Sequence, residues 1–375
     1  MTTPASDDDP QLGDGTVTLR RLRAGDLDAV VEQSRDPATI RWTRVPVPYA
    51  RWHAADFLAR VAAGWAKGTR RTLAVEAEGR YAGAVELRLD GHGGAEIGFV
   101  LSPWARGRGL MSRAVRLLLA WGFDTQGLTV VHWHAHAGNW SSRRVAWACG
   151  FRYEGTIRDL LVCRGERRDA WVGSLRRGEP MVPAHRWLAA PVITGRALVL
   201  RPWREEDAER VAAACADPVS QWWLPQLPAP YDVCDALGFV RSREEEHAAG
   251  RGIFWCVADP GDNRCLAAMS LMIETRSPDA AEVGYWAHPD ARGRGVVTEA
   301  VRLAARHAAV AEDDGGLGLH RLVLRAAAGN TASRRVAERA GFVEVGRELE
   351  GERHRDGSRE DFVRYELLTR DVVAG

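Results

Sequence analysis

The sequence predicts a protein of the α/β (α+β) class, built as two tandem copies of one unit that combines strands and helices. The segment Arg106–Gly109 recurs as Arg292–Gly295, and in both places it follows a short apolar run ending in proline and precedes a helical pattern. Matched residues such as Asp26 and Asp207 carry the repeat toward the ends of each copy. The period of roughly 190 residues is that of a domain, whereas solenoid units run about 20–50 residues.

The first part of each copy alternates strand and helix patterns. Residues 16–22 alternate apolar and polar side chains, which predicts a half-buried strand. Asp26 stands where a helix N-cap is expected, and Asp36-Pro37 marks the end of that helix. A second amphipathic stretch covers residues 57–65. Three strands separated by glycine-bearing turns are then expected at residues 71–76, 80–89 and 95–101.

The later part of each copy begins with the glycine-bearing loop. In the first copy we expect a helix at residues 112–122, a strand at 130–137 and a helix at 141–149, followed by a hairpin at 151–175. Gly150 and Gly341 stand where these last helices stop. The turn-rich segment 179–195 is predicted to link a domain at residues 10–178 to one at 196–375.

Composition limits the possible functions. The 51 Lys+Arg balance 50 Asp+Glu, giving a formal net charge of +1, so no overall field favours nucleic acid or a membrane surface. The six cysteines form no C-x-x-C pair and no metal-ligand spacing, which predicts a reduced, cytoplasmic protein without a metal. Residues 1–10 resemble neither a secretory signal nor a transit peptide, and no apolar stretch approaches the roughly 20 residues of a membrane helix.

The repeated loop has the chemistry of a phosphate site. Glycines let the backbone turn its amides inward and leave no side chain in the way of an anion. The start of the following helix adds N–H donors and a partial positive charge. Ser112 and Thr298, at the beginning of these helices, can each add a hydroxyl. The alternative is a helix start that contains glycines for structural reasons, but two copies in the same context favour a pyrophosphate.

With these motifs, the chain resembles the GCN5-related N-acetyltransferase (GNAT) superfamily over nearly its entire length, twice. The family pattern Arg/Gln-x-x-Gly-x-Gly/Ala fits Arg106–Met111 and Arg292–Val297, except that Met111 and Val297 stand at the last position. The later pairs Asn139/Ser142 and Asn330/Ser333, each followed by Gly-Phe, are similar to the branch that acetylates protein N-termini, including those of ribosomal proteins. The resemblance implies that each half is a mixed, mostly antiparallel twisted sheet flanked by helices.

The resemblance also implies acetyl-CoA as the co-substrate. Strand amides near the loop would stabilise the oxyanion, and the asparagines would hydrogen-bond the pantetheine arm. The residues implied for cofactor binding are Phe99, Val100, Leu101, Arg106, Gly107, Arg108, Gly109, Ser112 and Asn139 in the first copy, and Tyr285, Trp286, Ala287, Arg292, Gly293, Arg294, Gly295, Thr298 and Asn330 in the second.

Acetyl transfer to an amine needs a base, because amines are mostly protonated at neutral pH. Glu96 and Glu282 occupy equivalent positions at the start of the strand before the loop, where the family often places its base. A solvated carboxylate at a strand end is the alternative. Ser142 and Ser333 are implied to protonate or solvate the departing thiolate, against the alternative that this segment only caps a helix.

Histidine and tryptophan suggest where an acceptor could lie in the first copy. His132, His134 and His136 alternate along one strand and share a face, whereas the second copy has Val, Arg and Ala there. Three histidines on one face could bind a metal, or one could act as a base. Because no acidic or cysteine partner is near in sequence, a substrate-facing polar wall containing His134 is favoured. Four tryptophans could line an acceptor groove or belong to the core: Trp42, Trp52, Trp133 and Trp140. Of these, Trp42 and Trp133 are the candidates for the groove.

These features predict an acetyl-CoA-dependent N-acetyltransferase acting on a primary amine. The acceptor would be a peptide or protein N-terminus, or an amine-bearing metabolite such as an antibiotic, attacked directly in a ternary complex. The alternative is one catalytic half and one non-catalytic half that binds acyl-CoA as a scaffold or sensor. We expect no nucleic-acid or membrane partner, and either a monomer whose halves form a pseudo-dimer or a homodimer.

Overall fold

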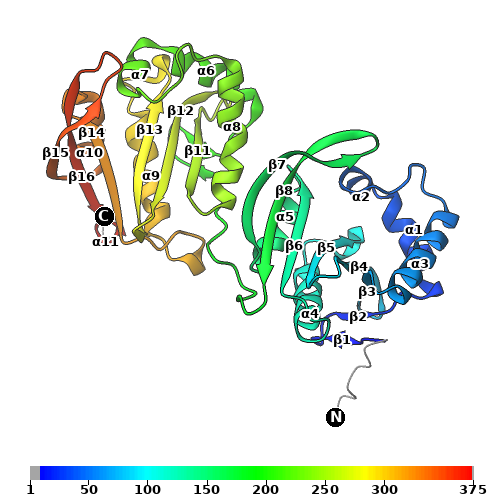
Figure 1. Ribbon diagram of the computed structural model, residues 1–375. Coiled ribbons are helices and arrows are strands. Elements are labelled where there is room, and N and C mark those ends of the chain that lie inside the picture. Colours follow the sequence, from blue (N-terminus) through cyan, green and yellow to red (C-terminus); the bar gives the residue numbers. More distant parts are fainter. Residues whose placement is uncertain (1–8, 374–375) are drawn as a thin grey trace. The chain divides into compact units, whose positions relative to one another are not determined.

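The computed structural model describes residues 9–373. Most of the acidic start of the chain and the last two residues of the predicted second domain lie outside that range. Two compact units divide between Ala184 and His185, and each is described by itself (Figure 1).

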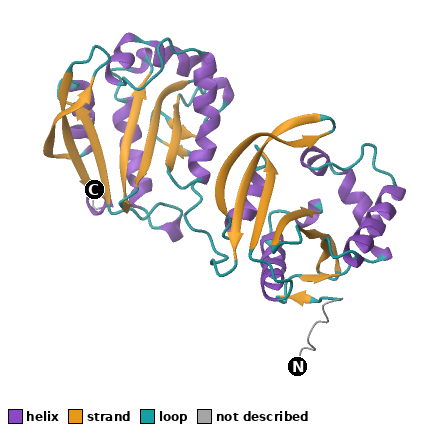
Figure 2. Ribbon diagram, in the orientation of Figure 1, coloured by secondary structure: helices purple, strands orange, loops and turns teal. Residues whose placement is uncertain are grey.

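The first unit holds an eight-stranded sheet with helices against it (Figure 2). Its strands are β1 Leu12–Gly13, β2 Thr18–Arg20, β3 Arg70–Ala77, β4 Arg80–Leu89, β5 Gly94–Leu101, β6 Val130–His136, β7 Arg152–Cys163 and β8 Glu166–Arg176. Its helices are α1 Leu27–Arg35, α2 Pro37–Trp42, α3 Arg51–Ala66, α4 Leu110–Asp124 and α5 Trp140–Ala148. The predicted strand at 16–22 is shorter than expected, and the sequence reasoning missed β1 and α2.

The second unit repeats this arrangement. Its strands are β9 Ile193–Thr194, β10 Val199–Arg201, β11 Gly252–Ala258, β12 Cys265–Glu274, β13 Ser277–Ala287, β14 Arg321–Ala327, β15 Val343–Arg353 and β16 Arg359–Leu368. Its helices are α6 Ala208–Ala216, α7 Pro218–Trp223, α8 Val233–Ala248, α9 Val296–Ala309, α10 Thr331–Ala340 and α11 Thr369–Val373.

Both sheets are mixed and mostly antiparallel, as predicted. Strand order is β1-β2-β3-β4-β5-β6-β8-β7 in the first unit and β9-β10-β11-β12-β13-β14-β16-β15 in the second. The parallel pairs are β5 with β6 and β13 with β14, and a helix connects the two strands of each pair. A parallel neighbour requires such a crossover connection, and this connection carries the glycine-bearing loop.

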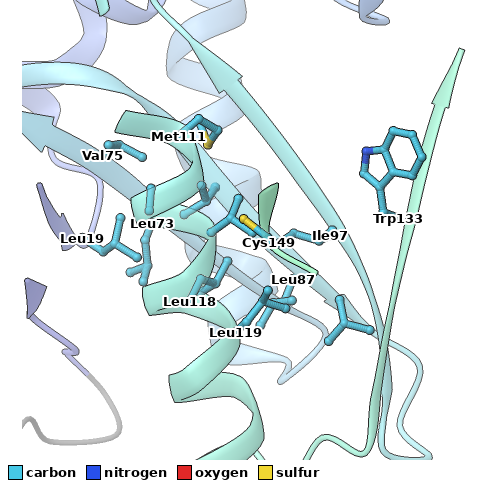
Figure 3. Close-up of a cluster of buried hydrophobic side chains, with 14 of the residues drawn as sticks. Leu19, Leu73, Val75, Leu87, Ile97, Met111, Leu118, Leu119, Trp133 and Cys149 are labelled. Carbon is cyan, nitrogen blue, oxygen red and sulfur yellow. The ribbon is translucent and has the colours of Figure 1, made fainter. Parts of the chain in front are cut away.

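The core of the first unit lies between the sheet and α4 (Figure 3). Alternate strand residues such as Leu73 and Ile97 point to this side, and helical spacing brings Leu118 and Met111 onto the facing stripe of α4. Met111 is buried in this core, so the bulky residue in the loop motif points away from the loop surface. An equivalent core joins α9 to the second sheet.

Asp26 and Asp207 precede helices as predicted, but neither side chain caps the helix. The Asp26 carboxylate is buried and accepts two hydrogen bonds from Arg20, at 2.8 Å each. Asp207 accepts the same pair from Arg201, at 2.8 and 2.7 Å. Both aspartates thus stand at the N-cap position as predicted, but a buried arginine on the preceding strand, rather than helix amides, satisfies each carboxylate.

Most of the predicted linker is packed rather than free. Met181 packs against the first core, and Leu188 is buried in the second. Ile193–Thr194 forms the edge strand β9, so the second sheet begins inside the segment 179–195. Pro191 accepts a hydrogen bond from the Trp255 indole at 2.9 Å. A proline-rich and glycine-rich composition did not reveal these contacts because each is made with residues far away in sequence.

Two further properties of the described chain bear on its chemistry. All six cysteines are free thiols. Within residues 9–373, no helix has both the length and the apolar character that crossing a bilayer requires.

Candidate active sites

The two glycine-bearing loops have the same backbone conformation. Gly107 and Gly109 have φ of 73° and 71°, and Gly293 and Gly295 have 74° and 77°, all in the left-handed region that favours glycine. In each loop the second glycine directly precedes a helix. The first intrahelical bond of α4 joins the Arg113 amide to the Gly109 carbonyl, so the amides before it point out of the helix end. This arrangement can bind a phosphate in either unit.

The first arginine of each loop is held by an ion pair. Arg106 lies 2.6 Å from Asp36, which caps α2, and Arg292 lies 2.6 Å from Asp217, which caps α7. Burial raises the pKa of Asp36, but the Arg106 guanidinium and hydrogen bonds from Thr39 together hold the pKa below its usual value. These side chains therefore tie the loop to a helix and leave the loop amides as the anion donors.

The second arginine of each loop is exposed. Arg108 pairs with Glu78, and Arg294 reaches the Asp290 carbonyl at 3.5 Å. Neither contact buries the guanidinium, so both side chains stay at the surface beside the loop.

A cavity of about 810 Å³ in the second unit joins the loop to the far end of the sheet. Of the residues predicted for this copy, all but Arg294 line it: Glu282, Tyr285, Trp286, Ala287, Arg292, Gly293, Gly295, Thr298, Asn330 and Ser333. Residues from Glu282 to Ser333, far apart in sequence, thus surround one space.

The cavity lies where two parallel strands separate. Pairing of β13 with β14 ends at Glu282 and Val323, and pairing of β5 with β6 ends at Ile97 and Trp133. Beyond these pairs, the facing edge of β13 is no longer bonded to β14. Its amides near Tyr285 can therefore reach a molecule that lies between the strands.

The predicted asparagines cap helices. The Asn139 side chain accepts a hydrogen bond from the Ser142 amide at 3.3 Å, and Asn330 does the same for Ser333 at 3.1 Å. The capping alternative is therefore confirmed for both asparagines, and each keeps its NH₂ group as a donor.

The two predicted serines meet different aromatic partners. Ser333 Oγ lies 2.9 Å from the hydroxyl of Tyr285, and burial raises the pKa of this tyrosine to about 12. Ser142 Oγ instead accepts a hydrogen bond from the Trp133 indole at 3.0 Å. Phe99, which matches Tyr285, has no hydroxyl. In the first unit the hydrogen-bond donor to the serine is therefore the Trp133 indole, on the neighbouring strand β6.

Residues that differ at the helix starts make the same structural link. Arg113 on α4 pairs with Asp14 at 2.9 Å, in the turn between β1 and β2. Glu299 on α9 accepts bonds from the Arg196 and Ala197 amides, in the turn between β9 and β10. Arg113, which follows Ser112, and Glu299, which follows Thr298, therefore both connect the start of a helix to the turn between the first two strands of its unit.

The acidic end of the second cavity contains two carboxylates. Glu282 is held by Arg325 through both oxygens, at 3.1 and 2.7 Å. Glu352 on β15 also lines the cavity, and burial raises its pKa. Sequence reasoning missed Glu352, although the prediction of a closing hairpin placed it in the right element; the bulges in that hairpin hide which of its residues face the cavity.

The first unit has a different arrangement at this end. Arg88 lies 3.3 Å from one oxygen of Glu96, and His134 Nδ1 lies 3.6 Å from the other. The His134 ring, followed by Arg88 and Arg44, lowers the pKa of Glu96 against the effect of burial. Glu96, His132 and His134 line a smaller cavity of about 410 Å³.

Of the two tryptophans predicted for an acceptor groove, one is contradicted by the structure and the other stays a prediction. Trp133 is only 2% exposed and lies in the core, so its assignment to an acceptor groove was wrong. Successive strand residues face opposite sides, so Trp133 points away from the face that carries His134. Trp42 lies at the end of α2, and its counterpart Trp223 lines the second cavity.

The remaining histidine and tryptophans line neither of these two cavities. His136 is buried, and burial together with Arg168 and Arg44 lowers its pKa. Trp52 is exposed against His53, and Trp140 packs on Trp171. No group of three or more metal-ligating side chains is found within residues 9–373.

Comparison with known proteins places this geometry in a family. The acetyltransferase (GNAT) domain matches residues 16–152 and 197–343. YdaF of Bacillus subtilis (strain 168), provisionally named a ribosomal N-acetyltransferase, is 40% identical over 91 residues, which are 24% of this chain and 46% of that protein. Spermidine N(1)-acetyltransferase of Escherichia coli (strain K12) is 30% identical over 104 residues, 27% of this chain and 56% of that protein. The chain thus spans about half the length of these curated relatives.

Solved structures are similar at lower identity. RimJ of Mycobacterium smegmatis, in complex with CoA-disulfide, has 21% identity and a TM-score of 0.41, covering 45% of this chain and 87% of that one. The microcin C7 self immunity acetyltransferase MccE, in complex with acetyl-CoA and AMP, has 18% identity and a TM-score of 0.41, covering 44% and 93%. Because the two domain matches together cover more than half of the sequence, the chain belongs to the GNAT family of acetyltransferases, with one domain of the family in each half.

Proposed function

We propose that this acetyltransferase moves an acetyl group from acetyl-CoA to a primary amine by direct attack in a ternary complex. The observation that carries the proposal is the second unit's cavity, which connects the glycine-bearing loop at one end to Glu352 at the other. A donor with a diphosphate at the loop would place its thioester toward the carboxylate. The two curated relatives are named as N-acetyltransferases, one provisionally as a ribosomal enzyme and one for spermidine, which supports an amine acceptor.

The donor would lie along the separated strands. The diphosphate would take hydrogen bonds from amides at Gly293, Gly295 and the start of α9. The Asn330 NH₂ group would donate to the pantetheine arm, and amides at Tyr285–Ala287 would donate to the oxyanion that forms during attack. Each of these residues lines the cavity.

Proton transfer would then involve groups at the acceptor end. The amine loses a proton to the Glu352 carboxylate, its nitrogen bonds to the thioester carbon, and the carbon–sulfur bond breaks. The Ser333 hydroxyl donates a proton to the departing thiolate and recovers one from solvent. We favour Glu352 over Glu282 as the base because Arg325 engages both oxygens of Glu282.

The acceptor class follows from the same end of the cavity. We propose an amine that presents a neutral or ammonium nitrogen to Glu352 beside the Trp223 ring, both of which line the cavity. A peptide N-terminus and an amine metabolite both meet this requirement. Acetyl is the acyl group proposed, since that is the group named for the family.

The test is a thiol-release assay with acetyl-CoA and a panel of acceptors. The panel contains tetrapeptides with varied free N-termini, spermidine and a set of amine-bearing antibiotics. We expect acceptor-dependent release of CoA thiol, with the acetylated amine found by mass spectrometry. Absence of acceptor-dependent release across the panel, in protein that binds acetyl-CoA, would argue against the proposed activity.

A further inference from the structure

We propose that the first unit is a second acetyl-transfer site in which His134, oriented by Glu96, is the general base. This inference rests on the proposed N-acetyltransferase function. The first unit lacks the carboxylate that Glu352 provides in the second unit. Asp159 and Glu350 each donate their amide to the aspartate of the opposite hairpin strand, Asp169 or Asp361, which aligns the two hairpins. Two residues later, Leu161 stands where the second unit has Glu352.

A pair of residues on the neighbouring strands supplies acid–base chemistry instead. Glu96 Oε2 lies 3.6 Å from His134 Nδ1, and Arg88 lies 3.3 Å from Glu96 Oε1. An ionised carboxylate at this place favours the tautomer with the proton on Nδ1, because it can accept that proton's hydrogen bond. The Nε2 lone pair is then free to take a proton.

The position of His134 suits contact with an acceptor. The β5–β6 ladder ends at Trp133, so His134 is the first residue of β6 beyond the last parallel pair. Its side chain is a quarter exposed and, with Glu96, lines the cavity of about 410 Å³. The counterpart in the second unit is Arg325, which cannot accept a proton and is bound to Glu282 by two hydrogen bonds.

The charged groups around this pair include Asp90, which lines the same cavity, and arginines from neighbouring elements. Arg88 on β4 and Arg44 after α2 both favour the ionised form of Glu96. His132 shares the cavity, and Arg168 on β8 acts on the buried His136 farther along the same strand face. The Glu96 carboxylate therefore remains charged beside the imidazole.

The proposed step balances without any added reactant. The amine nitrogen attacks the acetyl-CoA carbonyl, a carbon–nitrogen bond forms, and His134 Nε2 takes the proton that the amine loses. The carbon–sulfur bond breaks, and the thiolate takes a proton from the Ser142 hydroxyl, whose oxygen is held by the Trp133 indole. The imidazolium and the serine then exchange protons with solvent.

The experiment uses the full chain with the second unit disabled by Glu352→Gln, assayed for thiol release with the acceptor panel. In this background we expect residual turnover that His134→Ala lowers by about 10²–10⁴-fold. Added free imidazole should restore about tenfold of that loss, because it can enter the space left by the side chain. His92→Ala, at an exposed turn, is the matched control for losing a histidine, and acetyl-CoA titration checks that each variant is folded.

Each outcome has one meaning. Turnover that needs His134 and recovers with imidazole supports the inference. Unchanged turnover in the double variant, loss that imidazole does not relieve, or no residual turnover in Glu352→Gln would overturn it. Absence of turnover in the wild-type chain would instead contradict the proposed function, so the two failures are distinguishable.

Discussion

The two units have the same backbone arrangement where the acetyl donor is proposed to bind, and different side chains where the amine acceptor is proposed to bind. The loop glycines have φ values within a few degrees of each other, and the two asparagines cap equivalent helices, α5 and α10, through equivalent serine amides. On the closing hairpin, however, the second unit has Glu348, Glu352 and Glu360, and the strand pairing places Ile157, Leu161 and Arg168 at the matching positions in the first.

This comparison separates what the fold requires from what substrate choice requires. Backbone amides and helix ends bind the donor, and they depend on conformation rather than on side-chain identity. The acceptor meets side chains on a solvent-facing hairpin, where a change from Leu to Glu costs the fold little. Duplication thus leaves the donor site in both units while the acceptor site diverges.

The largest expected effect tests whether the acceptor sides use different bases. Glu352→Gln, in a chain whose first unit carries His134→Ala, should lower thiol release by about 10²–10⁴-fold, because the carboxylate that takes the amine proton is lost. Leu161→Gln, added to the His134→Ala chain, is the matched control and should leave its turnover unchanged, because that turnover comes from the second unit. A full rate for Glu352→Gln in the His134→Ala chain would remove the proposed difference between the units.

The next effect concerns the buried ion pairs that both units share. Asp207→Ala leaves Arg201 buried beside the neutral Asn263, whereas Asp26→Ala leaves Arg20 paired to Glu76 at 2.7 Å. We expect Asp207→Ala to lower the free energy of unfolding by about 3–5 kcal/mol, and Asp26→Ala by less. Urea denaturation measures both. Equal losses would mean that Glu76 contributes nothing once Asp26 is gone.

A pH dependence sharpens the contrast between the two carboxylates. Burial raises the pKa of Glu352, while His134 lowers the pKa of Glu96. A base must be ionised to act, so turnover by the second unit should fall about tenfold for each pH unit below the pKa of Glu352, beginning at a higher pH than for an ordinary glutamate. The measurement is a profile of kcat against pH in the His134→Ala chain. A profile without an acid limb would contradict Glu352 as the base.

The smallest expected effect compares the two tethers between helix and hairpin. Arg113 and Asp14 form a partly exposed ion pair, for which about 0–1 kcal/mol is expected. Glu299 accepts bonds from two backbone amides, so Glu299→Ala should cost about 1–2 kcal/mol. Thermal unfolding of Arg113→Ala and Glu299→Ala compares the two. A larger loss for Arg113→Ala would reverse the ranking.

Sequence reasoning found the features that depend on local pattern. The loops, the strands around them, the hairpins and the helix-ending glycines follow from periodicity and from glycine positions, and the second cavity gathers nearly all the residues predicted for that copy. These features could be predicted because the same pattern of residues occurs in both halves of the sequence.

Most errors come from tertiary contacts that a local sequence pattern does not specify. The Asp26 carboxylate pairs with Arg20 on β2 rather than with helix amides, and residues of the expected linker pack into both cores. Trp133 was assigned to the wrong face because composition does not say which face of a strand is covered by helices. Glu352 was missed because bulges shift the register of its hairpin.

The most direct test of the account is a calorimetric titration of the full chain with acetyl-CoA. We predict two equivalents bound, and we predict that Gly109→Ala and Gly295→Ala each weaken one of them, because alanine is strained at a positive φ in a loop whose amides would hold the diphosphate. Binding unaffected by both substitutions, or no binding at all, would contradict the claim that these two loops hold the donor.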